Sequence, residues 1–188
     1  MNEIITALQN WNAIRKDAGA LISFFNNLEG FKLDMSLFPV GVPLHAYPAI
    51  KDNALYFVVI SEDYDVESPS DELEQHCFWM ECKESLMNSQ EITEEDALSR
   101  IDTWLNTKIE WINDITQTDL GIYQNFFIPT YDLLPQTYKA NFALKDGLNP
   151  SLKAADLVLK SQSNLFFDTI IGEPPFIDRK KYYILDLL

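Results

Sequence analysis

The chain has 188 residues, of which 47% are apolar and 13% are aromatic, and its formal net charge is −15. The apolar content excludes an intrinsically disordered chain, and the negative charge disfavours proteins that neutralise nucleic-acid phosphates or lie on membranes through basic faces. An acidic globular protein remains, and its length predicts a single domain over residues 1–188.

A long helix is predicted at the start of the chain, over residues 2–29. Asn2 is the expected N-cap and Gly30 the expected C-terminal stop. Apolar residues recur there at spacings of three, four and seven, which places them on one helical face. These residues are Ile4, Leu8, Trp11, Ala18, Leu21, Phe25 and Leu28.

The next segment, residues 31–43, contains two prolines and a glycine and is interpreted as a connection. A β-hairpin is then predicted from strands 44–50 and 55–61, because the Asp-Asn pair between them can adopt the positive φ angles of a tight turn. Pro48 predicts that the first strand lies at a sheet edge, whereas the second is apolar on both faces and therefore central. A third strand is predicted over 76–82.

A second long helix is predicted over residues 93–116. Thr93 is a suitable N-cap, and the acids that follow it suit the positive end of the helix dipole. Residues 138–144 alternate as a strand does. An Asn-Pro pair then favours the start of a short third helix over about 150–160.

The C-terminal part predicts two further strands, residues 165–171 and 176–187, around a Gly-Glu-Pro-Pro turn. We therefore expect an α+β fold in which a mostly antiparallel sheet packs against the helices at about 2–29, 93–116 and 150–160.

A search for catalytic or cofactor motifs finds little. The sequence lacks G-x-G-x-x-G, Gly-Lys-Ser/Thr, G-x-S-x-G and H-E-x-x-H, so no nucleotide, metal or other cofactor is predicted. His45 and His76 are the only histidines. Cys77 and Cys82 are interpreted as buried free thiols on opposite faces of a strand. We favour a non-enzymatic protein.

The negative charge is concentrated in one stretch of the sequence. Between Ser61 and Asp96 there are thirteen acidic residues and one basic residue, Lys83. A general solubility charge would be spread over the surface, so this stretch, about residues 62–96, predicts a local function. The spacing of the acidic residues in this stretch resembles that of a calcium-binding loop only in part, because Ser68 stands at the position where an EF-hand requires glycine.

The leading hypothesis is a protein-interaction module that binds a basic protein through this acidic stretch. In composition it is similar to small acidic bacterial proteins that neutralise basic toxins or mimic nucleic acid. Nucleic acid and membranes are not expected partners. We name the predicted binding residues the acidic patch: Glu62, Asp63, Asp65, Glu67, Asp71, Glu72 and Glu74.

Two alternatives come from other features. The first is a small-molecule-binding domain, with or without enzymatic activity, whose aromatic pocket between sheet and helix includes Trp79, Trp104 and Trp111. The second is a subunit of a larger assembly, such as a homo-oligomer formed through the apolar C-terminal segment 182–188. The N-terminus lacks a secretory pattern, so we expect a cytoplasmic location.

Overall fold

The computed structural model describes residues 2–67, 70–83, 93–130, 133–147, 152–163, 165–168, 171–173 and 182–188. These residues form one curled sheet in which every paired strand is antiparallel to its neighbour. The strand order is β8-β7-β6-β1-β4-β3-β2-β5-β9. The strands are β1 (Gly30–Asp34), β2 (Leu44–Lys51), β3 (Ala54–Ser61), β4 (Phe78–Lys83), β5 (Asn125–Ile128), β6 (Thr137–Lys145), β7 (Ala154–Lys160), β8 (Phe166–Phe167) and β9 (Ile171–Glu173).

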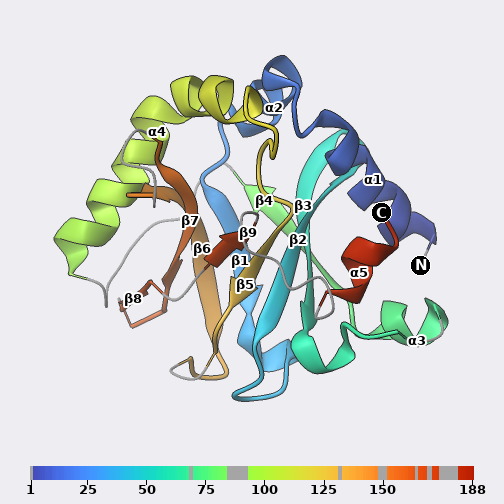
Figure 1. Ribbon diagram of the computed structural model, residues 1–188. Helices are drawn as coiled ribbons and strands as arrows, with labels where there is room; N and C mark the ends of the chain where they lie inside the picture. Colours follow the sequence, from blue (N-terminus) through green and yellow to red (C-terminus); the bar gives the residue numbers. More distant parts are fainter. Residues whose placement is uncertain are drawn as a thin grey trace.

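Helices cover the curled sheet from several sides (Figure 1). In the view of Figure 1, α4 runs along the upper left towards α2, while α1, α5 and α3 lie on the right. Two short 3-10 helices, η1 (Met35–Leu37) and η2 (Glu62–Tyr64), follow β1 and β3. The α-helices are α1 (Asn2–Ile14), α2 (Ala18–Phe25), α3 (Ser70–Gln75), α4 (Glu94–Thr116) and α5 (Tyr183–Asp186).

The main hydrophobic core fills the inner face of the curled sheet. Side chains from β1, β3 and β6, such as Phe31, Phe57 and Phe142, meet Trp104 of α4 there. A second cluster lies on the outer face of β2 and β3, where α1 and α5 cover Tyr47 and neighbouring side chains. Burial on both faces explains why β2 and β3 are almost continuously apolar.

Several predicted elements are confirmed. The strands at 44–50 and 55–61 form the β2–β3 hairpin, and Asp52 and Asn53 adopt φ angles of 49° and 60° in its turn. The predicted helix at 93–116 is α4, and the Thr93 side chain accepts a hydrogen bond from the Asp96 backbone. The α+β class and the antiparallel sheet are also as predicted.

The predicted helix over 2–29 is wrong as a single element. It divides into α1 and α2, because the Asp17 side chain accepts a hydrogen bond from the Ala20 backbone and caps a new helix. At the break, the Arg15 carbonyl accepts a hydrogen bond from the distant Ile122 backbone instead of from the next helical turn. Gly30 is not a helix stop but the first residue of β1.

The connection predicted over 31–43 contains the central strand β1, which pairs with β4 and β6. Gly30 allows this pairing, because a Cβ atom there would lie 1.8 Å from the Ala140 carbonyl oxygen. The edge position predicted from Pro48 is also wrong, since β2 lies between β3 and β5. However, β5 pairs only with residues 44–46 of β2, so Pro48 lies beyond its end.

The short helix predicted over 150–160 is strand β7, whose residues from 154 to 160 all pair with β6. Leu157 and Leu159 face the inner core while Val158 faces outward, which is the period of a strand. The strand predicted over 176–187 is wrong at its end, where α5 forms a helix, and its residues 176–181 lie outside the described residues. The strand predicted over 165–171 contains β8 and the first residue of β9.

Candidate functional site

The acidic patch begins where β3 ends. The chain leaves β3 at Ser61, forms η2 and then reaches α3. Asp63, Glu67 and Glu74 are exposed, and Glu62 is half-buried. Asp71 and Glu72 lie in α3, and their side chains are outside the described part of the structure. Three acids of the patch are therefore exposed on its described surface.

Asp65 does not belong to this surface, and its predicted role as a partner-binding residue is wrong. Its residue exposure is 1%. The Oδ2 atom accepts hydrogen bonds from the Tyr47 hydroxyl and from Nδ1 of His45, the latter at 2.7 Å. The Oδ1 atom accepts a hydrogen bond of 2.9 Å from the Ile184 backbone. A buried carboxylate needs such partners, and here they come from two other elements.

His45 and Tyr47 lie on the outer face of β2, because alternate residues of a strand point to the same side. Burial raises the pKa of Tyr47 well above its usual value, and the charge and hydrogen bond of Asp65 raise it further. The phenol therefore stays protonated and donates to the carboxylate. We call His45, Tyr47 and Asp65 the buried anchor, because they fasten the acidic patch to β2 and to α5.

Two further contacts hold the patch in shape. The rings of Tyr64 and His76 stack with centroids 3.6 Å apart and an interplanar angle of 2°. Leu73 of α3 is 1% exposed and packs in the outer core cluster. Tyr64 and Val66 remain 41% and 50% exposed, so apolar surface lies among the exposed acids. Mixed apolar and charged surface is typical of protein-binding sites.

The buried anchor contains a histidine oriented by an aspartate, a pair that can act as a general base elsewhere. Here the other ring nitrogen, His45 Nε2, is fully buried and has no hydrogen-bond partner among the described residues. The Tyr182 ring, which precedes α5, lies 4.2 Å from the His45 ring between centroids. In this closed arrangement the hydrogen bond to Asp65 fixes the orientation of the buried His45 ring.

The apolar C-terminal segment packs within its own chain. Tyr182, Ile184 and Leu185 are buried in the outer core cluster against α1 and β2. The apolar sequence that suggested a homo-oligomer therefore finds its packing partner intramolecularly. Tyr182 occupies the N-cap position of α5 but makes no side-chain hydrogen bond to the helix. The Asp65 carboxylate takes this role instead by accepting a hydrogen bond from the Ile184 backbone.

The three tryptophans predicted to line a pocket do not come together. Trp104 and Trp111 are buried in the inner core, with ring centroids 5.9 Å apart, and Trp104 packs edge-on against Phe25. Trp79 lies on the outer face of the sheet, where its ring is 5.2 Å from the Lys51 ammonium group. The sheet–helix interface around these rings is packed core.

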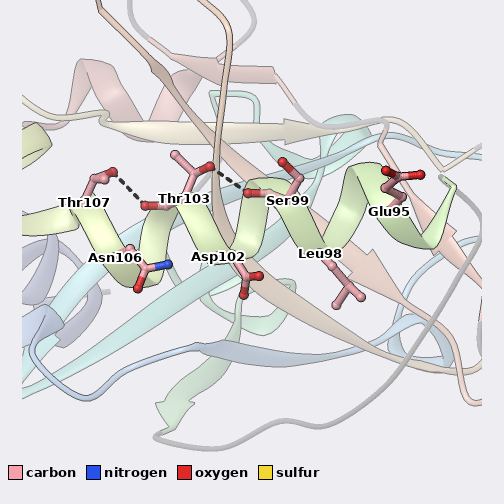
Figure 2. Close-up of a pocket in the computed structure, with 7 residues that line it drawn as sticks. All are labelled: Glu95, Leu98, Ser99, Asp102, Thr103, Asn106 and Thr107. Atoms are coloured by element: carbon pink, nitrogen blue, oxygen red, sulfur yellow. Dashed lines mark hydrogen bonds between the residues drawn. The ribbon is translucent and has the colours of Figure 1, made fainter.

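The hollow that does lie along α4 is on its outer, polar face (Figure 2). Its lining residues all belong to this one helix and include no tryptophan. The hydroxyls of Thr103 and Thr107 donate to backbone carbonyls four residues earlier, at 2.7 Å each. The hydroxyl protons of these two threonines are therefore already used within the helix. It is lined by Glu95, Leu98, Ser99, Asp102, Thr103, Asn106 and Thr107.

Both cysteines are free thiols, of which Cys82 is buried as predicted from the sequence and Cys77 is half-buried. Burial, together with the charges of Asp65 and Glu74, raises the pKa of Cys77 to about 12. Burial also raises the pKa of Cys82 well above its usual value. Cys77 packs on the outer face and Cys82 on the inner face, so they cannot form a local disulfide or join one metal site. Within the described residues no group of three or more His, Cys, Asp and Glu side chains is placed to hold a metal ion.

A network of four charged residues was not predicted from the sequence. Arg100 of α4 and Lys145 of β6 both contact Asp156 of β7 and Asp168, at distances of 2.5–3.2 Å. Burial raises the pKa of Asp156, against the effect of the two cations. For Asp168, burial is outweighed by the hydrogen bond from Arg100 and the charge of Lys145, and the pKa is lowered. The network fastens α4 to the sheet.

Comparisons with protein-family models, curated proteins and solved structures each returned no match. Among the helices that the structure describes, none combines the length and the apolar character needed to cross a bilayer.

Proposed function

We propose that this protein is an interaction module that binds a basic protein through the exposed part of its acidic patch. The observation that carries the proposal is the surface around η2, where the exposed acids Asp63 and Glu67 alternate with the exposed apolar side chains of Tyr64 and Val66. Aromatic and apolar side chains supply the desolvated centre of an interface, and the acids around them favour a basic partner.

The buried anchor supports this proposal by making the surface rigid. Asp65 lies between the exposed acids on both sides, and its carboxylate is held by two residues of β2 and by the α5 backbone. The stacked rings of Tyr64 and His76 close the same loop. A preorganised surface loses less conformational entropy on binding than a mobile acidic tail.

The experiment uses a short oligolysine peptide as a defined basic probe. Its affinity for the full chain is measured by isothermal titration calorimetry at several salt concentrations, for the native protein and for Asp63→Asn/Glu67→Gln. We expect saturable binding at low salt that weakens as salt rises, because electrostatic association is screened. If both acids contact the peptide, the double variant will bind it at least about tenfold more weakly than the native protein does.

A second double variant, Tyr64→Ser/Val66→Ser, separates docking from simple charge attraction. It retains every charge, so a specific interface with an apolar centre predicts a loss of affinity for a basic protein partner that persists at high salt. Equal binding by the native protein and by the acid-neutralised variant would overturn the proposal. Absence of saturable binding to the oligolysine peptide at low salt would overturn it as well.

A further inference from the structure

The apolar surface of α4 is wider than the part that the rest of the protein covers. Trp104 lies on the side of the helix that faces the inner core. On the neighbouring side, Leu98, Leu105 and Ile109 remain 43%, 40% and 50% exposed. Together with Asp102 they follow one another at intervals of four, three and four residues, so they lie in one line along the helix. We call Leu98, Asp102, Leu105 and Ile109 the α4 ridge.

The spacing of the α4 ridge is that of a helix–helix contact. Intervals that alternate between four and three residues are those of the two core positions of a heptad, which meet a second helix in a coiled coil. At a rise of about 1.5 Å per residue, the ridge from Leu98 to Ile109 is about 16 Å long. Figure 2 shows Leu98 and Asp102 projecting from the same side of α4. The ridge therefore has the line and the length to contact about three turns of another helix.

The charges of α4 are strongly biased towards acids. The helix carries six acidic and two basic residues. Both basic side chains are directed towards other elements, because Arg100 pairs with two aspartates outside the helix and Lys108 donates a hydrogen bond to the Asn26 carbonyl. Asp102 is exposed and forms no ion pair with the described residues, and the exposed Glu95 lies two turns before it. A partner with positive charge beside an apolar stripe is therefore complementary to this surface.

We propose that the α4 ridge docks an amphipathic helix of another protein, whose apolar stripe is flanked by lysine or arginine. The apolar stripe packs on Leu98, Leu105 and Ile109, and one basic side chain lies opposite Asp102. A second copy of this chain does not fit, because a symmetric pair of α4 helices would bring their acidic residues together. In Figure 1, α4 lies at the upper left and α3 at the lower right, so the α4 ridge is a second surface, separate from the acidic patch.

Binding is tested with a fluorescein-labelled peptide of three heptads, which carries leucine at the two core positions of each heptad and lysine or alanine elsewhere. A control peptide has serine in place of every leucine and therefore carries the same charge. Fluorescence anisotropy measures the affinity of each peptide for the full chain at about 0.15 M salt. We expect the leucine peptide to bind at least about tenfold more tightly than the serine peptide, because only the leucine peptide can bury apolar side chains against the ridge.

A first pair of variants tests the apolar part of the ridge. Leu98→Ser/Leu105→Ser removes two of its apolar side chains. The matched control is Leu37→Ser/Leu134→Ser, which changes leucines that are 45% and 66% exposed, in η1 and before β6. We expect the ridge variant to bind the leucine peptide at least about tenfold more weakly than the native protein does, and the control variant to stay within about twofold. Because all four leucines are well exposed, both variants should keep the melting temperature within a few degrees of the native value.

A second pair of variants tests the charge in the ridge. Asp102→Asn removes the acid within the ridge, whereas Asp114→Asn removes an exposed acid about 120° further around the same helix. We expect Asp102→Asn to weaken binding of the leucine peptide at least about threefold and Asp114→Asn to leave it within about twofold.

A final comparison separates this surface from the acidic patch. Asp63→Asn/Glu67→Gln should leave the affinity for the leucine peptide within about threefold of the native value. Equal binding of the two peptides, or equal effects within either pair of variants, would overturn the proposal. A larger loss in Asp63→Asn/Glu67→Gln than in Leu98→Ser/Leu105→Ser would overturn it as well, while leaving the proposal for the acidic patch standing.

Discussion

Removing the carboxylate of Asp65 should destabilise the protein far more than removing any exposed acid of the same loop. In Asp65→Ala, the His45 ring, the Tyr47 hydroxyl and the Ile184 backbone N–H all lose their acceptor. A buried donor without a partner costs about 1–3 kcal/mol, and three of them set an upper range of about 3–9 kcal/mol. Because they share one carboxylate and can relax together, we expect a loss of about 3–5 kcal/mol in the free energy of unfolding.

The assay is urea denaturation followed by circular dichroism, with Asp63→Ala as the matched control. Asp63 lies two residues earlier in the same loop and is exposed, so its loss should change the free energy of unfolding by no more than about 0.5 kcal/mol. Amide hydrogen exchange gives a local readout, since the Ile184 amide should lose protection only in Asp65→Ala. A loss below about 1 kcal/mol in Asp65→Ala, or an equal loss in both variants, would refute the reasoning.

Three further predictions concern the sheet, the ion network and the core. Gly30→Ala will lower the free energy of unfolding by at least about 3 kcal/mol, because the new Cβ atom would lie 1.8 Å from paired backbone. Gly41→Ala will lower it by only about 1 kcal/mol, because Gly41 has a φ of 77° but open space around it. Both are measured by urea denaturation, and equal losses in the two variants would contradict this prediction. The lowered pKa of Asp168 means that its ion pairs stabilise the fold above the unfolded-state value of 3.8 and that this contribution disappears as the pH falls through the folded-state pKa. The melting temperature of the native protein should therefore fall more steeply between about pH 5 and pH 2 than that of Asp168→Asn, and parallel curves would contradict the assignment. Trp104→Ala should cost about 3–5 kcal/mol if Trp104 is packed core, and a loss below about 1 kcal/mol would indicate a pocket instead.

The elements that could be predicted from the sequence are those with strong local signals. The Asp52-Asn53 turn sets the β2–β3 hairpin through its two positive φ angles. The Thr93 cap and the periodicity that follows it define α4. In both cases residues close in sequence determine the conformation, so no knowledge of distant contacts is required.

The elements that were missed depend on pairing with distant parts of the chain. Strand β1 has only five residues, and its position at the centre of the sheet comes from β4 and β6 rather than from its own composition. Strand β7 contains residues that also suit a helix, and its complete pairing with β6 outweighs that propensity. Helix α5 has four residues, too few to be stable alone, and its docking on Asp65 maintains it.

Within the acidic patch, the position of Asp65 also depends on distant parts of the chain and could not be predicted from the local sequence. The sequence correctly marks the stretch as unusually acidic, but nothing local distinguishes Asp65 from the exposed acids on either side. Its partners are 20 residues away in β2 and 119 residues away in α5. Alternation in β2 already placed His45 and Tyr47 on one face, yet only the folded structure brings the carboxylate to them.

The measurement that tests the central proposal most directly compares two charge-reversal variants of equal net charge. One is Asp63→Lys/Glu67→Lys, within the acidic patch, and the other is Glu110→Lys/Asp114→Lys, on the exposed face of α4. Binding of the oligolysine peptide is measured for both by fluorescence anisotropy at the same salt concentration. If the acidic patch is the binding surface, reversal within it will abolish binding while reversal on α4 leaves the affinity within about threefold of the native value. Equal loss in the two variants would show that the overall charge attracts the peptide, and it would contradict the proposal.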